Sequence, residues 1–298
     1  MKNVLVRAAL LSSAVVAMNP AFANHSWGSY HWARTTNPLN LTVNVAVGSD
    51  WSQSVNTAIG DWNQSNVLTL IGVPKSGVST RKCDPISGQI LVCSDSYGLR
   101  GWLGVASIWA SGSHITQATT KLNDSYYSPS YAGGFYNTGP WRALVACQEI
   151  GHDFGLDHQD ENFDNPNLGT CMDYTNDADG GGTYGPSNEH PNQHDYDQLA
   201  TIYSHSDGGG GGSGGGGTCN PKSPKCNNGA GDAFTFREVG QPHPAQGTAA
   251  VGNWGRTVSY DKAGRPDTFE LDLGGGNRRL THVFWVPGFK PLPEQMHD

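Results

Sequence analysis

The chain has 298 residues and a formal net charge of −8, from 18 lysines and arginines against 26 aspartates and glutamates. This length allows one large domain or two smaller ones with a buried core. The stretch from Ala143 to Asp207 holds 13 carboxylates and no lysine or arginine. Nucleic acid and anionic membranes are therefore disfavoured as partners, because both reward basic side chains.

The first 23 residues have the pattern of a secretory signal peptide. Lys2 and Arg7 precede the short apolar run AALLSSAVVAM, and AFA at 21–23 supplies the small residues of a cleavage site. The run is too short to span a bilayer comfortably, and no second candidate follows. We expect cleavage after about Ala23 and a secreted, extracellular or periplasmic protein.

Residues 24–207 form the body of the protein and alternate strand and helix patterns. Segment 39–47 alternates apolar and polar residues, as a half-buried strand does. The segment that follows begins with a capping residue and spaces its apolar residues as an amphipathic helix. The other predicted elements are strands at 89–93, 102–109 and 114–122, a helix from the Gly139-Pro140 pair to Gly155, and a short helix at 194–205. This order predicts an α/β domain with a mostly one-sheet core.

A glycine run, GGGGGSGGGG at 208–217, reads as a flexible linker. The tail, residues 218–298, carries the strand-like pieces AFTFREV, RTVSYD, DTFELDL and THVFWVP, which predict a small all-β C-terminal domain. Its aromatic residues could form a core or stack on a polysaccharide or cell wall, and a core is the simpler interpretation. The histidines of the tail have no metal-ligand spacing, and we interpret them as ordinary structural or surface residues: His243, His282 and His297.

Six cysteines suit an oxidising compartment. They fall into pairs that are near in sequence, and proximity favours disulfides Cys83–Cys93, Cys147–Cys171 and Cys219–Cys226 among the possible connectivities. A cysteine-based metal site is disfavoured because no C-x-x-C occurs. A disulfide also explains Cys83 better than a free thiol that plugs a metal site.

Residues 148–158 read QEIGHDFGLDH. Side chains four residues apart share one face of a helix, so Gln148 and His152 point the same way, with Glu149 beside them. Gly155 permits a sharp turn with positive φ that brings His158 towards the same point. Three neutral donors and an open position form the arrangement of a catalytic zinc. Glu149 would then take a proton from metal-bound water and pass it to the leaving amine.

This segment resembles the zinc-binding consensus of the metzincin metalloendopeptidases, H-E-x-x-H-x-x-G-x-x-H, in every position but the first, and HDFGLDH is especially similar to the matrixins. A Q-E-x-x-H form also occurs among gametolysin-like metzincins. CMDY at 171–174 resembles the methionine turn of the family, with Met172 as the turn residue. The resemblance implies that Tyr174 binds the ion or donates a hydrogen bond to the tetrahedral oxyanion.

The resemblance also implies a zincin-type fold, with a twisted, mostly parallel sheet over an active-site helix, and a monomeric endopeptidase acting on protein or peptide. The strand at 114–122 would be the sheet edge that pairs with substrate. An acidic rim would favour basic peptides. The body follows the signal peptide directly, which leaves no room for a propeptide with a cysteine plug, so we expect any latency to come from the tail.

Gln148 is the departure from the consensus, and three interpretations stay open. Its amide oxygen can serve as a third ligand, although this donor is harder and weaker than imidazole. A histidine from elsewhere can complete the site instead, with His114, His190 and His194 as candidates. The glutamine can also mark a catalytically inert, secreted binding module. Zinc is the expected ion, copper is a further option, and the acidic loop from Asp157 to Asp179 is a candidate for calcium without EF-hand spacing.

Overall fold

The structure is a computed structural model that describes residues 25–182, 185–207 and 252–292. The predicted signal peptide, the glycine linker, the Cys219–Cys226 pair and the AFTFREV strand lie outside the described residues. The helices and strands are β1 (His31–Trp32), β2 (Leu39–Ala46), α1 (Ser49–Trp62), β3 (Leu68–Pro74), β4 (Ile90–Asp95), β5 (Trp102–Ser111), β6 (His114–Asn123), α2 (Gly139–His152), α3 (Gln193–Ile202), β7 (Arg256–Tyr260), β8 (Pro266–Gly274) and β9 (Asn277–Trp285).

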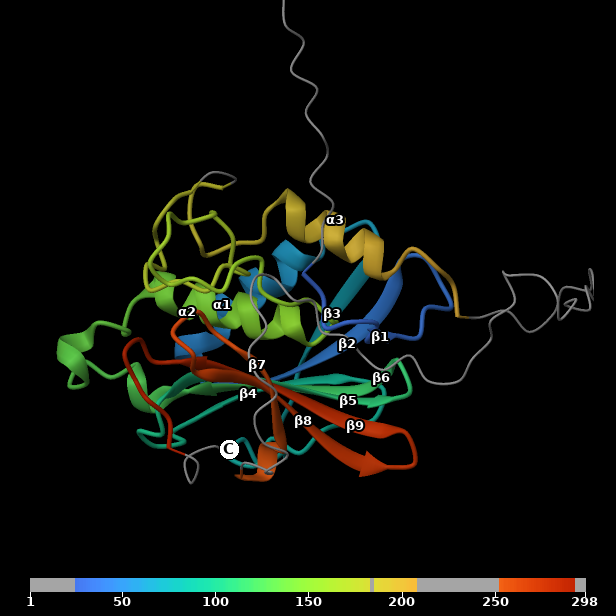
Figure 1. The fold of residues 1–298 in the computed structure, drawn as a ribbon, viewed down its shortest axis with the longest axis horizontal. Helices are drawn as coiled ribbons and strands as arrows, with labels where there is room; N and C mark the ends of the chain where they lie inside the picture. Colours follow the sequence, from blue (N-terminus) through green and yellow to red (C-terminus); the bar gives the residue numbers. More distant parts are fainter. Residues whose placement is uncertain (1–24, 183–184, 208–251, 293–298) are drawn as a thin grey trace, which may run out of the picture.

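All described strands belong to one mixed sheet in the order β3-β2-β4-β6-β5-β9-β8-β7, with β1 paired to one end of β6. The pairs β2–β3, β2–β4 and β4–β6 are parallel. The pairs from β6 through β5, β9 and β8 to β7 are antiparallel. The three α-helices lie on the same side of this sheet (Figure 1). The predicted α/β class is therefore confirmed.

Helix α2 crosses the centre of the fold, and all of its residues from Ala143 to His152 are buried. It packs against α1 and against β5, and α1 contributes a buried stripe that includes Trp51, Val55 and Trp62. The main core lies between these helices and the sheet. A second, smaller core covers the opposite face of β5, β9 and β8, and it includes Trp102, Trp254 and Trp285.

Two expectations about strand placement need correction. The strand at 114–122 is not an edge, because β6 lies between β4 and β5. The tail strands β7, β8 and β9 do not form a sheet of their own, since β9 pairs with β5 along its whole length and extends the sheet of the body. The tail aromatics Trp254 and Trp285 are 1% and 0% exposed, so they pack in a core and offer no stacking surface.

Most of the predicted strands occur within two residues of the expected bounds. Helices α2 and α3 end three residues earlier than predicted, β9 begins four residues earlier, and β1 and β3 were missed. The disulfides Cys83–Cys93 and Cys147–Cys171 are formed as predicted. Two disulfides fit an oxidising, extracellular environment. Among the described helices, none is long and apolar enough to cross a membrane.

Candidate metal centre

Helix α2 carries the first half of the motif into the core and ends where the motif needs a turn. Thr138 caps the helix, and its hydroxyl accepts a first-turn backbone N–H at 3.3 Å. The helix ends at His152, and Gly155 then adopts a φ of 95°. A Cβ on residue 155 would lie 2.3 Å from the carbonyl oxygen of Tyr30. Only glycine therefore fits this turn.

Three buried imidazoles meet beyond this turn. His152 and His158 come from the motif, and the third ring is His282 from strand β9 of the tail. The ring centroids lie 4.9 Å apart for His152 and His158, 4.1 Å for His152 and His282, and 4.5 Å for His158 and His282. One nitrogen from each ring lies within 4.8 Å of the other two. We refer to these residues as the three-histidine cluster.

The two nitrogens of each ring have different environments. Each Nδ1 has a partner: the carbonyl oxygen of Leu156 lies 2.9 Å from that of His152, Glu161 Oε1 lies 3.0 Å from that of His158, and Glu149 Oε2 lies 3.3 Å from that of His282. Each Nε2 is buried without a hydrogen-bond partner among the described residues. Partners on Nδ1 fix the orientation of a metal-binding imidazole, and they leave Nε2 for the ion.

The cluster therefore fits a transition metal ion. Burial lowers the pKa of His152 and of His282 well below the usual value, and each ring is further disfavoured as a cation by the neighbouring imidazoles. Neutral imidazole is the form that binds a metal. Three imidazoles suit zinc, and also copper, iron or nickel. An ion would also bind the three buried Nε2 atoms, whose desolvation is otherwise not compensated by any hydrogen bond from the described residues.

Glu149 lies beside the cluster and is fully buried. Its Oε2 contacts His282 Nδ1, whereas its Oε1 has no hydrogen-bond partner among the described residues. Burial, with a smaller contribution from Asp153, raises the pKa of Glu149 well above its usual value. Strand β5 passes close over this carboxyl group, since a Cβ on Gly104 would lie 2.7 Å from Glu149 Cγ.

Gln148 lies one helical turn before His152, and its side chain is anchored to the loop below the helix. Its Nε2 donates to the carbonyl oxygens of Cys171 at 2.8 Å and Asp173 at 3.1 Å. Its Oε1 is buried without a partner among the described residues. No described residue donates a hydrogen bond to the amide oxygen of Gln148, so its lone pairs could bind a metal ion. The third imidazole of the cluster is that of His282.

None of the three histidines proposed as a replacement ligand belongs to the cluster. His114 Nε2 lies 3.3 Å from Asp207, His190 Nδ1 lies 2.7 Å from Asp61 Oδ2, and the ring of His194 stacks on another histidine. His282, which the sequence indicated to be an ordinary structural or surface residue, is instead the third member of this cluster. Because strand residues alternate in direction, Leu280, His282 and Phe284 share one face of β9, and its two apolar members belong to the main core. No local spacing in the sequence signals this position, because it depends on how β9 pairs with β5.

Met172 packs under α2, and Tyr174 lies beside the three-histidine cluster. A Cβ on Gly151 would come 2.7 Å from Met172 Sδ, so the methionine packs directly under α2. The ring of Tyr174 stacks on His158 with a centroid distance of 4.8 Å and an interplanar angle of 17°. Its hydroxyl accepts a 3.4 Å hydrogen bond from the backbone N–H of Trp285. Strand β9 thus also engages the tyrosine.

The site is closed in this conformation. Gln148, Glu149, His152 and His282 are each 0% exposed. The pairing of β9 with β5 causes this closure, because the register places His282 opposite Ala106 in the middle of β5.

The acidic loop after the motif folds by hydrogen bonds of its own carboxylates. Asp160 accepts from Asn162 and Asn165, and Asp173 accepts from the backbone of Leu168. All four groups of candidate metal ligands among the described residues include a histidine. This ligand composition does not favour calcium, which prefers oxygen ligands.

No protein-family model matches the chain, and no curated protein matches it.

Proposed function

We propose that the protein is a secreted, metal-dependent endopeptidase of zincin type, held in a closed state by its own tail. The observation that carries the proposal is the contact of Glu149 with His282, one of three clustered imidazoles whose Nε2 atoms lack a partner among the described residues. Hydrolytic metal sites combine a set of neutral ligands with a nearby carboxylate that acts as the general base. The motif and its methionine turn support the same conclusion.

His152, His158 and His282 would hold the ion in the closed state, and zinc is the ion we favour. A bound zinc ion supplies Lewis acidity and lowers the pKa of a water molecule towards neutrality. Glu149 would accept the proton and return it to the leaving amine, for which a raised pKa is suitable. Tyr174, next to His158, would donate a hydrogen bond to the developing oxyanion.

The position of β9 supports the closed state. Peptides commonly bind proteases and other receptors by adding a strand to a free sheet edge. In this protein β9 fills the edge of β5 in the antiparallel direction and brings His282 to the cluster. Displacement of β9 would free the edge and leave His152, His158 and the uncommitted Oε1 of Gln148 as donors. The ion would then be held by His282 in the closed state and by Gln148 in the open state, each together with His152 and His158.

The complete burial of the site favours a second candidate, which is a secreted binding module with a structural metal centre. In such a protein β9 would never leave, and Glu149 would serve only to orient His282. Removal of the tail separates the two candidates, because it should activate a peptidase and should give a binding module no activity.

The test uses the chain from residue 24 with a recognition sequence for a specific protease inserted into 208–217, so that the body folds before the tail is cut away. Casein cleavage is measured in zinc buffer before and after the cut, for the wild type and for Glu149→Ala. We expect weak cleavage by the intact chain, strong cleavage after the cut, and a loss of about 100-fold or more in the variant.

Absence of cleavage in both forms would refute the peptidase and support the structural centre. Equal cleavage by Glu149→Ala would refute the mechanism. An intact chain that cleaves casein and loses this activity on cutting would show that the tail completes the site and does not inhibit it.

A further inference from the structure

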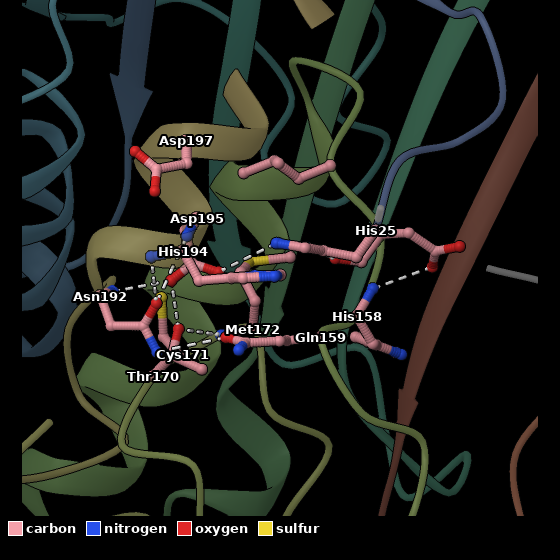
Figure 2. Close-up of polar contacts among 12 residues, drawn as sticks. His25, His158, Gln159, Thr170, Cys171, Met172, Asn192, His194, Asp195 and Asp197 are labelled. Carbon is pink, nitrogen blue, oxygen red and sulfur yellow. Dashed lines mark hydrogen bonds and ion pairs between the residues drawn. The ribbon is translucent and has the colours of Figure 1, made fainter. Parts of the chain in front are cut away.

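We propose a second, structural zinc site made of His25, His194 and Asp195, which fastens the N-terminal segment of the described chain to the start of α3. We refer to these three residues as the N-terminal cluster. It is distinct from the three-histidine cluster, and the two share no residue. Figure 2 shows His25 reaching towards His194 and Asp195 from a separate part of the chain.

Three buried atoms of the cluster lack a hydrogen-bond partner among the described residues: His25 Nε2, His194 Nδ1 and Asp195 Oδ1. One potential ligand atom from each of the three residues lies within 4.8 Å of the other two. His25 Nε2 and Asp195 Oδ1 are 3.5 Å apart, too far for a good hydrogen bond. Two ligands of one tetrahedral zinc, each bonded at about 2.1 Å, are about 3.4 Å apart. The separation therefore suits a bridging ion better than a direct contact.

The other side-chain polar atoms of His25 and Asp195 are already fixed. His25 Nδ1 lies 2.8 Å from the carbonyl oxygen of Asp157. Asp195 Oδ2 accepts from the Asn192 backbone at 2.7 Å and from the Thr170 hydroxyl. Such outer contacts orient the ligands and leave the unpartnered atoms for the ion.

A fourth donor is present on the same helix. Gln198 follows His194 by one helical turn, so both side chains share a face of α3. It is 3% exposed, and its Oε1 is buried without a partner among the described residues. Two imidazoles, a carboxylate and an amide oxygen would make a closed four-coordinate site, which is the form of a structural zinc centre.

The surface group His31, His205 and Asp207 gives a useful contrast. His31 is buried, whereas His205 is exposed and Asp207 is partly exposed. The two Nε2 atoms already have partners, since those of His31 and His205 lie 3.0 Å from each other and 3.5 and 3.3 Å from Asp207. Ion pairing and hydrogen bonding account for that group without a metal. They do not account for the N-terminal cluster.

The proposed site would stiffen the turn that holds His158. The backbone of Asp157 donates to the carbonyl oxygen of His25 at 3.1 Å, and Trp27 stacks on His152 with a centroid distance of 5.0 Å. An ion on His25 would therefore fix the segment that packs against both motif histidines. Its loss would loosen that segment without removing a ligand of the three-histidine cluster.

The experiment measures zinc per folded chain after equilibration at buffered free zinc, by elemental analysis. We expect His25→Gln and His194→Gln each to lose one ion relative to the wild type. His190→Gln, which removes a nearby imidazole that pairs with Asp61, should lose none. Asp195 is a poor choice for substitution, because its other oxygen caps α3. If both variants fold and keep every ion of the wild type, the proposal is wrong.

A second measurement covers variants that fold poorly and separates this site from the proposed function. In a His152→Gln chain, which lacks one ligand of the three-histidine cluster, added zinc should still raise the melting temperature. Addition of His194→Gln to that chain should abolish the increase. An increase that persists unchanged in the double variant would overturn the proposal, whatever the peptidase assay shows.

Discussion

Gln148 and His282 present different donors to the centre of the molecule, and this difference decides how the ion is held. An imidazole nitrogen is a better ligand for zinc than an amide oxygen. Glu149 orients the ring of His282, whereas the amide nitrogen of Gln148 donates hydrogen bonds to two backbone carbonyls of the loop below α2. In the closed state, His282 should therefore provide most of the affinity for zinc, and Gln148 should hold the loop below α2 in place.

We expect His282→Ala to weaken zinc binding at the three-histidine cluster by more than about 100-fold, which is the upper end of the effect of outer-shell partners. The affinity is measured by competition with a chromophoric chelator in a His25→Gln chain, so that the N-terminal cluster does not contribute. Val283→Ala is the matched control, because Val283 faces the other core. An equal loss in the control would mean that zinc binding depends on the strand and not on its imidazole.

We expect Gln148→Ala to keep the zinc of the intact chain and to lower the free energy of unfolding by about 1–3 kcal/mol or more, because two buried carbonyls lose their donor. Chemical denaturation at saturating zinc measures the change. Gln64→Ala, at an exposed position, should change stability by less than about 0.5 kcal/mol. Loss of zinc from the intact Gln148→Ala chain would instead make the glutamine a ligand in the closed state.

At the scale of elements, α2 and the turn after it form a rigid unit that aims His152 and His158 at one point. The turn depends on Gly155, whose Cα approaches the N-terminal segment too closely for any side chain. Strand β9 is the complementary element, since it brings the third imidazole from the far end of the chain. The first unit is local in sequence and the second is not.

We expect Gly155→Ala to destabilise the protein by at least about 1–3 kcal/mol, because φ is 95° and the new methyl group would collide with Tyr30. Gly60→Ala is the control: it lies in α1, with open space around the new methyl group. That change should stabilise the protein by about 0.5–1 kcal/mol. Thermal unfolding of both variants decides, and equal effects would contradict the role given to the turn.

The same distinction explains what the sequence could predict. The apolar spacing of α1 and α2, the strand at 39–47 and the motif turn are encoded within short windows, so they were predicted close to their observed bounds. Strand β3 was missed because its outer half is exposed and carries Gly72 and Pro74, which blur the alternation. Helical spacing predicted that Glu149 and His152 lie together, and the Gly155 turn predicted that His158 returns to His152, as the structure shows. His282 could not be placed, because a strand pairing across the linker determines its neighbours.

At the scale of the whole molecule, the sheet is continuous from the body into the tail. Strand β5 pairs with β6 on one side and with β9 on the other. In the described structure, neither side of β5 is therefore free to pair with a peptide. A strand that is not cross-linked to its neighbour can separate from it, at the cost of the backbone pairing and of the apolar surface that the strand buries. The proposed activity therefore depends on whether β9 separates from β5.

A reversible covalent link between these strands tests that dependence. Ser107 and Thr281 are buried cross-strand partners whose side-chain oxygens lie 2.9 Å apart, which suits replacement by a disulfide. In the Ser107→Cys, Thr281→Cys chain carrying the insertion at 208–217, the cut should give no casein cleavage while the link is oxidised. Mild reduction should then restore the activity to within a few-fold of the cut wild type.

The single variant Ser107→Cys, treated with the same reductant, controls for effects on the native disulfides. Bound zinc should stay unchanged in the oxidised chain, since the link holds His282 at the cluster. Full cleavage by the oxidised, cut chain would show that substrate reaches Glu149 with β9 in place. The closed state would then be no barrier, and the tail strand would be a permanent wall of the active site.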